Sequence, residues 1–141
     1  GVGQGHLPIG IRQTIARRPS RTRGTAEMIL ADRDLLALQT SARNLRDGEA
    51  RLVNAPWIPV PGGEIPGELG TLVINDDPVP ESDWNGRVHQ SARLLTSGGR
   101  LLLISRSTSI SRFAKQYRGA YREIADRRMH GFRATVFVRK D

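Results

Sequence analysis

Strand-sized apolar runs alternate with segments of helical periodicity along this chain, and the alternation leaves few possible folds. The apolar runs are read as buried strands, at residues 27–32, 51–54, 71–74 and 100–105. Apolar residues recur at helical spacing between and beside these runs, at residues 7–18, 34–45, 84–95 and 109–118. Apolar strands that alternate with helices predict an α/β fold with a parallel sheet covered on both faces.

The C-terminal segments predict a hairpin in place of another parallel crossover. Two strand-like segments, 121–127 and 132–139, are joined by a short turn at 129–131. A short turn permits antiparallel pairing only, so the sheet is expected to end in an antiparallel edge. The length of 141 residues suits one domain, and no repeat or long linker divides it. Residues 1–141 are therefore predicted to form a single domain.

Charge and composition indicate which class of partner the protein favours, and they exclude several kinds of functional site. A net charge of +8 on a chain of this size attracts polyanions and favours nucleic acid, with a solvated basic surface as the alternative. The absence of cysteine excludes disulfides, thiolate catalysis and cysteine-based zinc sites. No apolar run approaches the ~18 residues of a membrane span. We expect a protein of the cytoplasm, or of an organelle matrix, with no membrane partner.

Histidine and aromatic residues give little sign of further chemistry. His6, His89 and His130 are scattered, without the spacing of metal ligands, so no metal site is expected. Phe113 and Tyr117 recur with Tyr121 at positions i, i+4 and i+8, and this stripe is read as core more readily than as a base-stacking platform.

A glycine-rich segment opens the chain just before the first predicted helix. Gly1, Gly3 and Gly5 would let backbone N–H groups and a helix N-terminus approach a ligand closely. Asp32 ends the next predicted strand, about where an acid hydrogen-bonds a nucleoside ribose, and Asp34 is expected to cap the helix that follows. No Gly-Lys-Ser/Thr follows the glycines, which excludes a P-loop. Dinucleotide binding stays open, although the spacing is not Gly-x-Gly-x-x-Gly.

In this order the segments resemble the class I S-adenosylmethionine-dependent methyltransferases. The likeness is to their small methyltransferase domain group, which includes ribosomal RNA guanine-N2 methyltransferases. Matching segments span nearly the whole chain, at residues 1–6, 30–38, 42–45, 54–55, 95–104 and 131–137. The resemblance implies a Rossmann-like sheet, mostly parallel with an antiparallel C-terminal hairpin, and S-adenosylmethionine as cofactor. It also implies the residues that hold the cofactor: Gly1, Gly3, Gly5, Asp32, Asn54 and Ala55.

The resemblance further implies a catalytic turn at Asp76, Asp77 and Pro78. In this family an amide or carboxylate oxygen and a backbone carbonyl accept hydrogen bonds from the target amine and steer its lone pair toward the sulfonium methyl. The family carries Asn/Asp-Pro-Pro followed by an aromatic residue that stacks on the flipped base. This chain carries no aromatic residue directly after Pro78, which leaves Trp84 as the candidate for stacking.

A second departure concerns the family's first strand, which would precede Gly1. That strand is central in the sheet, so its loss would expose neighbouring edges and remove one wall of the cofactor site. We expect an upstream segment, or another chain, to complete the sheet.

The densest basic cluster follows the first predicted helix, at Arg17, Arg18, Arg21 and Arg23. These arginines are predicted to bind RNA phosphates, although cations near a helix C-terminus also favour its dipole without any partner. The leading hypothesis is therefore a methyltransferase that modifies an exocyclic amine in structured, ribosomal RNA. A catalytically inactive RNA-binding or ribosome-assembly protein on the same fold is the first alternative. A small-molecule or protein methyltransferase is the second.

Overall fold

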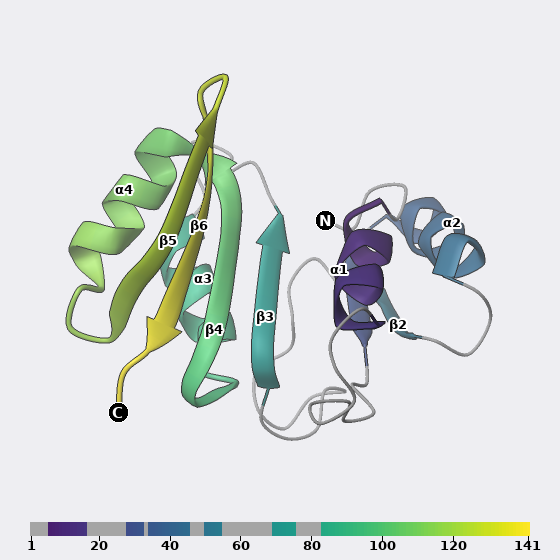
Figure 1. The fold of residues 1–141 in the computed structure, drawn as a ribbon, viewed down its shortest axis with the longest axis horizontal. Helices are drawn as coiled ribbons and strands as arrows, with labels where there is room; N and C mark the ends of the chain where they lie inside the picture. Colours follow the sequence, from purple (N-terminus) through teal and green to yellow (C-terminus); the bar gives the residue numbers. More distant parts are fainter. Residues whose placement is uncertain (1–5, 17–27, 33, 46–49, 55–68, 76–82) are drawn as a thin grey trace. The chain divides into compact units, whose positions relative to one another are not determined.

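The computed structural model describes residues 6–16, 28–32, 34–45, 50–54, 69–75 and 83–141, which belong to two compact units (Figure 1). The first unit lies within Gly1–Ile58 and the second within Pro59–Asp141. Each unit has a sheet of its own. The single domain expected over residues 1–141 stays a prediction.

The first unit is a parallel strand pair connected through a helix. Its elements are α1 (His6–Ala16), β1 (Ile29–Asp32), α2 (Leu35–Leu45) and β2 (Arg51–Asn54). β1 and β2 run parallel, and their last residues, Asp32 and Asn54, lie opposite each other. The apolar runs and the helical spacing between them predicted this β-α-β connection, because parallel strands need a crossover.

Three leucines form the core of the first unit. Leu30 of β1 packs with Leu38 and Leu45 of α2, and all three are buried. Ile9 of α1 packs against this cluster, so α1 contributes to the cover of the core. Leu35, the first residue of α2, is 55% exposed.

The second unit is a four-stranded sheet in the order β3-β4-β6-β5. Its elements are β3 (Leu69–Asn75), α3 (Trp84–Ala92), β4 (Leu95–Arg106), α4 (Ser107–Gln116), β5 (Tyr121–Met129) and β6 (Phe132–Arg139). β3 pairs with β4 in parallel, and the β4–β6 and β6–β5 pairs are antiparallel. The α/β class and the antiparallel C-terminal hairpin are confirmed.

β4 is longer than predicted and takes in the glycine turn that was expected before it. Leu95, expected to end the preceding helix, is instead the first residue of β4 and lies opposite Leu69. The next paired residues are Thr71 and Arg100, so the residues between Leu95 and Arg100 bulge out of the ladder. Gly98 has φ of 69°, a conformation that favours glycine. The glycine signal therefore marks a bulge within a strand.

A two-residue turn joins β5 to β6. His130 and Gly131 have φ of 49° and 84°, the left-handed values that tight antiparallel hairpins need. Met129 and Phe132 lie opposite each other on either side of the turn. The backbone N–H of Ser107 donates to the Gly131 carbonyl at 3.0 Å, which ties the turn to the first residue of α4.

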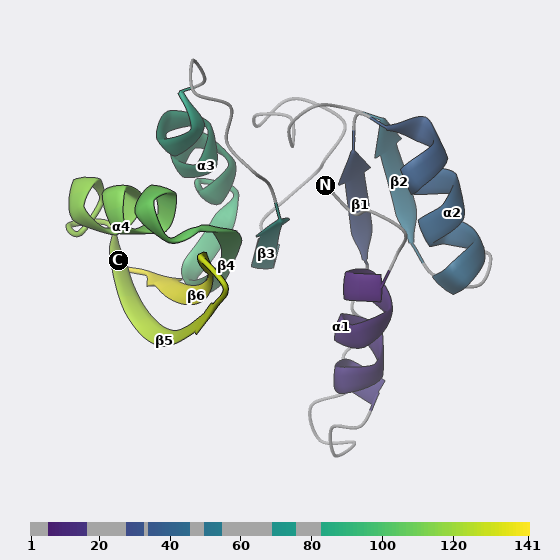
Figure 2. The ribbon, with the colours of Figure 1, turned by 90° about the horizontal axis from the view of Figure 1, so that it is seen from above.

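The core of the second unit lies between the sheet and its two helices. Figure 2 shows α3 and α4 on the same face of the sheet. Phe113 of α4 is fully buried, and its ring meets those of Trp84, Tyr121 and Phe137 at centroid distances of 6.5, 5.4 and 5.6 Å. Leu101 of β4 is buried as well. This apolar layer holds α3 against the sheet.

Candidate cofactor site

The candidate site begins at the carboxyl ends of β1 and β2. Asp32 and Asn54 are the last residues of these strands and are paired in register. In open α/β sheets, ligands bind outside the carboxyl ends of parallel strands. The structure therefore brings together two of the residues predicted for the cofactor, at the expected edge.

Two neighbouring acids after β1 have different structural roles. The Asp34 carboxylate accepts hydrogen bonds from the backbone N–H groups of Leu36 (2.9 Å) and Ala37 (3.2 Å) and caps α2, as predicted. Asp32 Oδ1 accepts a hydrogen bond from the Asp34 N–H at 3.0 Å. This bond orients the half-buried Asp32 carboxylate, whereas the Asp34 carboxylate caps α2.

α1 supplies a helix N-terminus directly after the glycine-rich segment. It begins at His6, and its first turn contains no acidic residue. Pro8 lies in that turn, where its missing N–H costs nothing. The positive end of the helix dipole at His6 can favour an anionic group such as a carboxylate.

Most of the other predicted site residues lie outside the described residues. These are Gly1, Gly3, Gly5, Ala55, Asp76, Asp77, Pro78, Arg17, Arg18, Arg21 and Arg23. The catalytic turn is located only by its neighbour, because β3 ends at Asn75. The roles of these residues stay predictions.

Trp84 does not supply the missing aromatic residue of the catalytic turn. It is the first residue of α3, 4% exposed, and its ring lies edge-on to Phe113. Asp83 caps the helix by accepting a hydrogen bond from the Gly86 N–H at 3.0 Å. Stacking on a base would require Trp84 to leave the core and the first turn of α3 to open. The expectation that Trp84 could stack is therefore corrected.

His89 belongs to the aromatic cluster, which the sequence did not reveal. Its ring stacks on Tyr117 at a centroid distance of 4.2 Å, and Nδ1 lies 3.2 Å from the Tyr121 hydroxyl. Burial, together with the charges of Arg93 and Arg139, lowers the pKa of His89 below its ordinary value. The core reading is confirmed for Phe113 and Tyr121, which are buried, and Tyr117 is half-buried. The sequence feature that could have indicated this role of His89 is its position in α3, directly after the buried Val88.

The described part of the chain contains neither a cluster of metal ligands nor a membrane-spanning helix. Within it, no three or more His, Cys, Asp or Glu side chains gather as metal ligands. Among the helices described, none has the length and apolar character to cross a bilayer.

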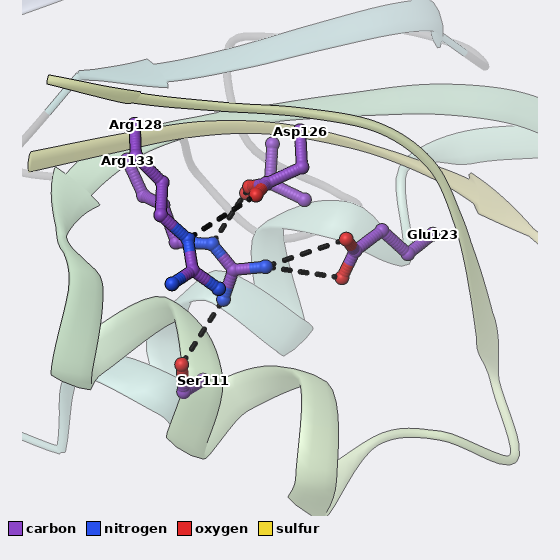
Figure 3. A network of polar contacts seen from close by, with 6 residues as sticks. Ser111, Glu123, Asp126, Arg128 and Arg133 are labelled. Carbon is purple, nitrogen blue, oxygen red and sulfur yellow. Dashed lines mark hydrogen bonds and ion pairs between the residues drawn. The ribbon is translucent and has the colours of Figure 1, made fainter.

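A buried arginine network attaches the hairpin to α4, and sequence reasoning missed it (Figure 3). Arg133 Nε donates to Asp126 at 2.7 Å, and its other nitrogens reach Ser111 Oγ at 3.0 Å and Glu123 at 3.3 Å. Thr135 Oγ1 also donates to Asp126, at 2.7 Å. The residues of this network lie on three elements, α4, β5 and β6, so only the β5–β6 register and the packing of α4 could reveal it.

This network makes the stability of the second unit sensitive to acid. Hydrogen bonds from Arg133 and Thr135 hold the pKa of Asp126 below its ordinary 3.8. The stabilisation is therefore complete above that ordinary value and is lost as the pH falls through the lower folded pKa. We expect Asp126→Asn to be less stable than the wild type at pH 6. When the pH is lowered from 6 to acid, its free energy of unfolding should fall less than that of the wild type. Urea unfolding at several pH values measures both.

Arg128→Gln is the matched control for this acid sensitivity. Arg128 lies 3.5 Å from Asp126, but its side chain is 70% exposed, and its charge is the smallest cause of the lowered pKa. We expect its pH profile to follow the wild type. Equal pH dependence in Asp126→Asn and the wild type would contradict the assignment.

No protein-family model matches the sequence, and no curated protein matches it. Solved structures do resemble it. A ribosomal protein methylase from Lactobacillus delbrueckii subsp. bulgaricus aligns over 100% of this chain and 68% of its own, with 12% identity and a TM-score of 0.74. An rRNA methylase from Streptococcus thermophilus aligns over 100% of this chain and 84% of its own, with 10% identity and a TM-score of 0.63.

A third solved structure contains a cofactor product. The N-methyltransferase NodS from Bradyrhizobium japonicum, in complex with S-adenosyl-L-homocysteine, aligns over 82% of this chain and 67% of its own, with 12% identity and a TM-score of 0.60. Identities this low show a shared fold alone. The chain therefore shares the fold of these methyltransferases.

Proposed function

We propose that the chain transfers the methyl group of S-adenosylmethionine to an exocyclic amine of a base in structured, ribosomal RNA. The observation that carries the proposal is the position of Asp32, at the carboxyl end of β1 and opposite Asn54, in a chain with the methyltransferase fold. A likeness to RNA guanine-N2 methyltransferases in the sequence segments adds the substrate class. The net charge of +8 adds electrostatic attraction to RNA.

The chemistry of Asp32 fits a nucleoside ligand. A ribose presents two hydroxyl donors, and a carboxylate held by a local backbone N–H offers acceptor oxygens in a fixed direction. Asp32 would hold the ribose, the glycine-rich segment before α1 would approach the amino-acid end, and Asn54 with Ala55 would lie at the adenine. When bound, S-adenosylmethionine supplies an electrophilic methyl on a sulfonium.

The residues directly after β3 would orient the substrate amine. An oxygen of Asp76 or Asp77 and the Pro78 carbonyl would accept its two N–H groups, so that the nitrogen lone pair points at the methyl. Such alignment is the main contribution that a protein makes to a displacement of this kind. Since Trp84 is buried, the base would be held without the stacking ring of the family.

A further strand would complete the sheet. Among the described strands, β3 is hydrogen-bonded to β4 and β1 to β2. An additional strand, from another segment or another chain, would pair with an edge that these strands leave open and form a wall of the cofactor site.

Separate alanine substitutions are expected to identify the acid of the catalytic turn. Removing the oxygen that accepts the amine should lower kcat by about 100-fold, with the KM for S-adenosylmethionine unchanged, because the contact is to substrate. Asp76→Ala and Asp77→Ala serve as controls for each other, and asparagine at the sensitive position should restore activity. Transfer of tritiated methyl to unmodified ribosomal RNA measures these rates. Equal and full activity in both alanine variants would contradict the assigned turn.

An inactive RNA-binding protein is the second candidate, and the buried Trp84 favours it. It predicts RNA binding without measurable affinity for S-adenosylhomocysteine. A protein substrate is the third candidate, since one structural neighbour is named as a ribosomal protein methylase. Label that enters protein and not RNA would establish it.

A further inference from the structure

We propose that the tip of the β5–β6 hairpin is a contact surface for single-stranded RNA. The hairpin tip is defined as Arg106, Arg127, Arg128, Met129, His130 and Phe132. Figure 1 shows the hairpin reaching beyond the end of α4. The inference rests on RNA as the partner of the proposed function. It adds a binding surface that does not follow from the fold and that lies outside the arginine cluster predicted from the sequence.

The tip holds apolar side chains outside the core. Phe132 is 48% exposed and Met129 is 70% exposed. The strand register places Phe132 between Met129 of β5 and Arg106 of β4, in one row across the sheet. Residues opposite each other on neighbouring strands share a face, so an exposed ring has a guanidinium on one side and a thioether on the other.

Both acids of the hairpin are ion-paired with an arginine. Asp126 and Glu123 both bind Arg133, whose side chain is only 8% exposed. Arg106, Arg127 and Arg128 are all exposed at the tip. The strand register puts Arg127 on the face of Phe132 and Arg128, opposite Arg133, on the face toward α4. Arg128 keeps an ion pair with Asp126 at 3.5 Å, but an exposed pair of this kind is worth little. The tip therefore carries a positive field.

The tip is held in one shape before any ligand binds. Its turn has only two residues, and the Gly131 carbonyl accepts a hydrogen bond from the Ser107 N–H at 3.0 Å. A surface fixed in this way loses little conformational entropy on binding.

An aromatic ring set among arginines suits unpaired nucleotides. A base can stack on the face of Phe132, and guanidinium groups match phosphate oxygens with two parallel hydrogen bonds. An acidic protein segment would use the arginines and leave the ring without a specific partner. Exposed aromatic rings on sheets are a recurrent means of holding single-stranded RNA.

The test uses the full chain and two fluorescent probes of equal charge, a twelve-unit oligouridylate and a twelve-unit abasic ribose-phosphate. The wild type should prefer the probe with bases. Phe132→Leu should weaken oligouridylate binding at least about fivefold and leave the abasic probe unchanged, because only stacking is lost. Arg127→Gln with Arg128→Gln should weaken both probes and flatten the salt dependence by roughly one unit or more of log–log slope.

The control is a second pair of exposed arginines, Arg118→Gln with Arg122→Gln, at the other end of the hairpin. It removes the same charge and should weaken either probe less than the tip pair does. Equal losses for the two pairs, or no effect of Phe132→Leu, would overturn the proposal. Competition by polyglutamate but not by oligouridylate would also overturn it, in favour of an acidic protein.

A parallel titration with S-adenosylhomocysteine separates this inference from the proposed function. All the tip variants should bind it as the wild type does. If no variant and no wild type binds it while the tip effects persist, the methyltransferase proposal fails and the tip assignment stands. If it binds normally and the tip variants bind RNA as the wild type does, only the tip assignment fails.

Discussion

Replacing Asp32 by alanine is expected to weaken the binding of S-adenosylhomocysteine by at least about 100-fold, because each hydrogen bond to a charged group contributes roughly 1.5–3 kcal/mol and a ribose offers two. The substitution removes the carboxylate at the end of β1 and leaves the paired backbone of Asp32 and Asn54 in place. Isothermal calorimetry on the full chain, beside a longer chain that includes any upstream segment, measures the affinity. RNA binding should be unchanged in this variant.

Asp32→Asn separates the loss of the ligand from a loss of local structure. An asparagine oxygen can still accept the hydrogen bond that the Asp34 N–H donates to Asp32 Oδ1. The turn into α2 should therefore be kept, and the unfolding midpoint should match the wild type. Affinity should fall less than in Asp32→Ala, since one acceptor oxygen remains. Wild-type affinity in Asp32→Ala would rule out this carboxylate as the ribose ligand.

Phe113→Ala is expected to cost about 3–5 kcal/mol of the free energy of unfolding of the second unit, the usual cost of emptying a buried aromatic site. Phe113 is fully buried, and its ring meets four other aromatic rings, those of Trp84, Tyr117, Tyr121 and Phe137. The cavity would lie between α4 and the sheet. Urea unfolding, followed by Trp84 fluorescence in a Trp57→Phe background, reports on this unit.

Phe132→Ala is the control, because it makes the same side-chain change at an exposed position. Phe132 is 48% exposed at the hairpin tip, so its removal should cost about 1 kcal/mol or less. A similar loss for the two phenylalanines would mean that the core is not centred on Phe113. Because Phe132→Ala should leave the fold intact, it also supports the use of Phe132 variants in the RNA-binding test.

Local features of the fold could be predicted from the sequence. The cap at Asp34 was predictable because a side chain that bonds backbone N–H groups two and three residues ahead needs no tertiary partner. The C-terminal hairpin was predictable for a similar reason, since two strand-like segments with a short turn between them can pair in only one way. The position of Asp32 followed from the end of an apolar run.

Features set by pairing between distant segments could not be predicted. Leu95 continues the helical spacing of Val88 and Ala92, and only its partner across the ladder, Leu69, makes it part of β4. The Arg133 network depends on which residues of β5 face it once a register shift between Glu123 and Ala125 is in place. Helical spacing placed Trp84 at the start of a helix but could not show that its ring packs edge-on against Phe113.

Among the described strands, β5 is the last of its sheet and is hydrogen-bonded to β6. A nine-residue edge strand is a template on which another chain can add a strand and begin to aggregate. Two features of β5 oppose such addition. Its register shifts between Glu123 and Ala125, and charged residues are spread along it from Arg122 to Arg128. The same charges that suit the hairpin for a polyanion thus protect the protein from self-association, so charge-neutralising variants of β5 should be prepared at low concentration.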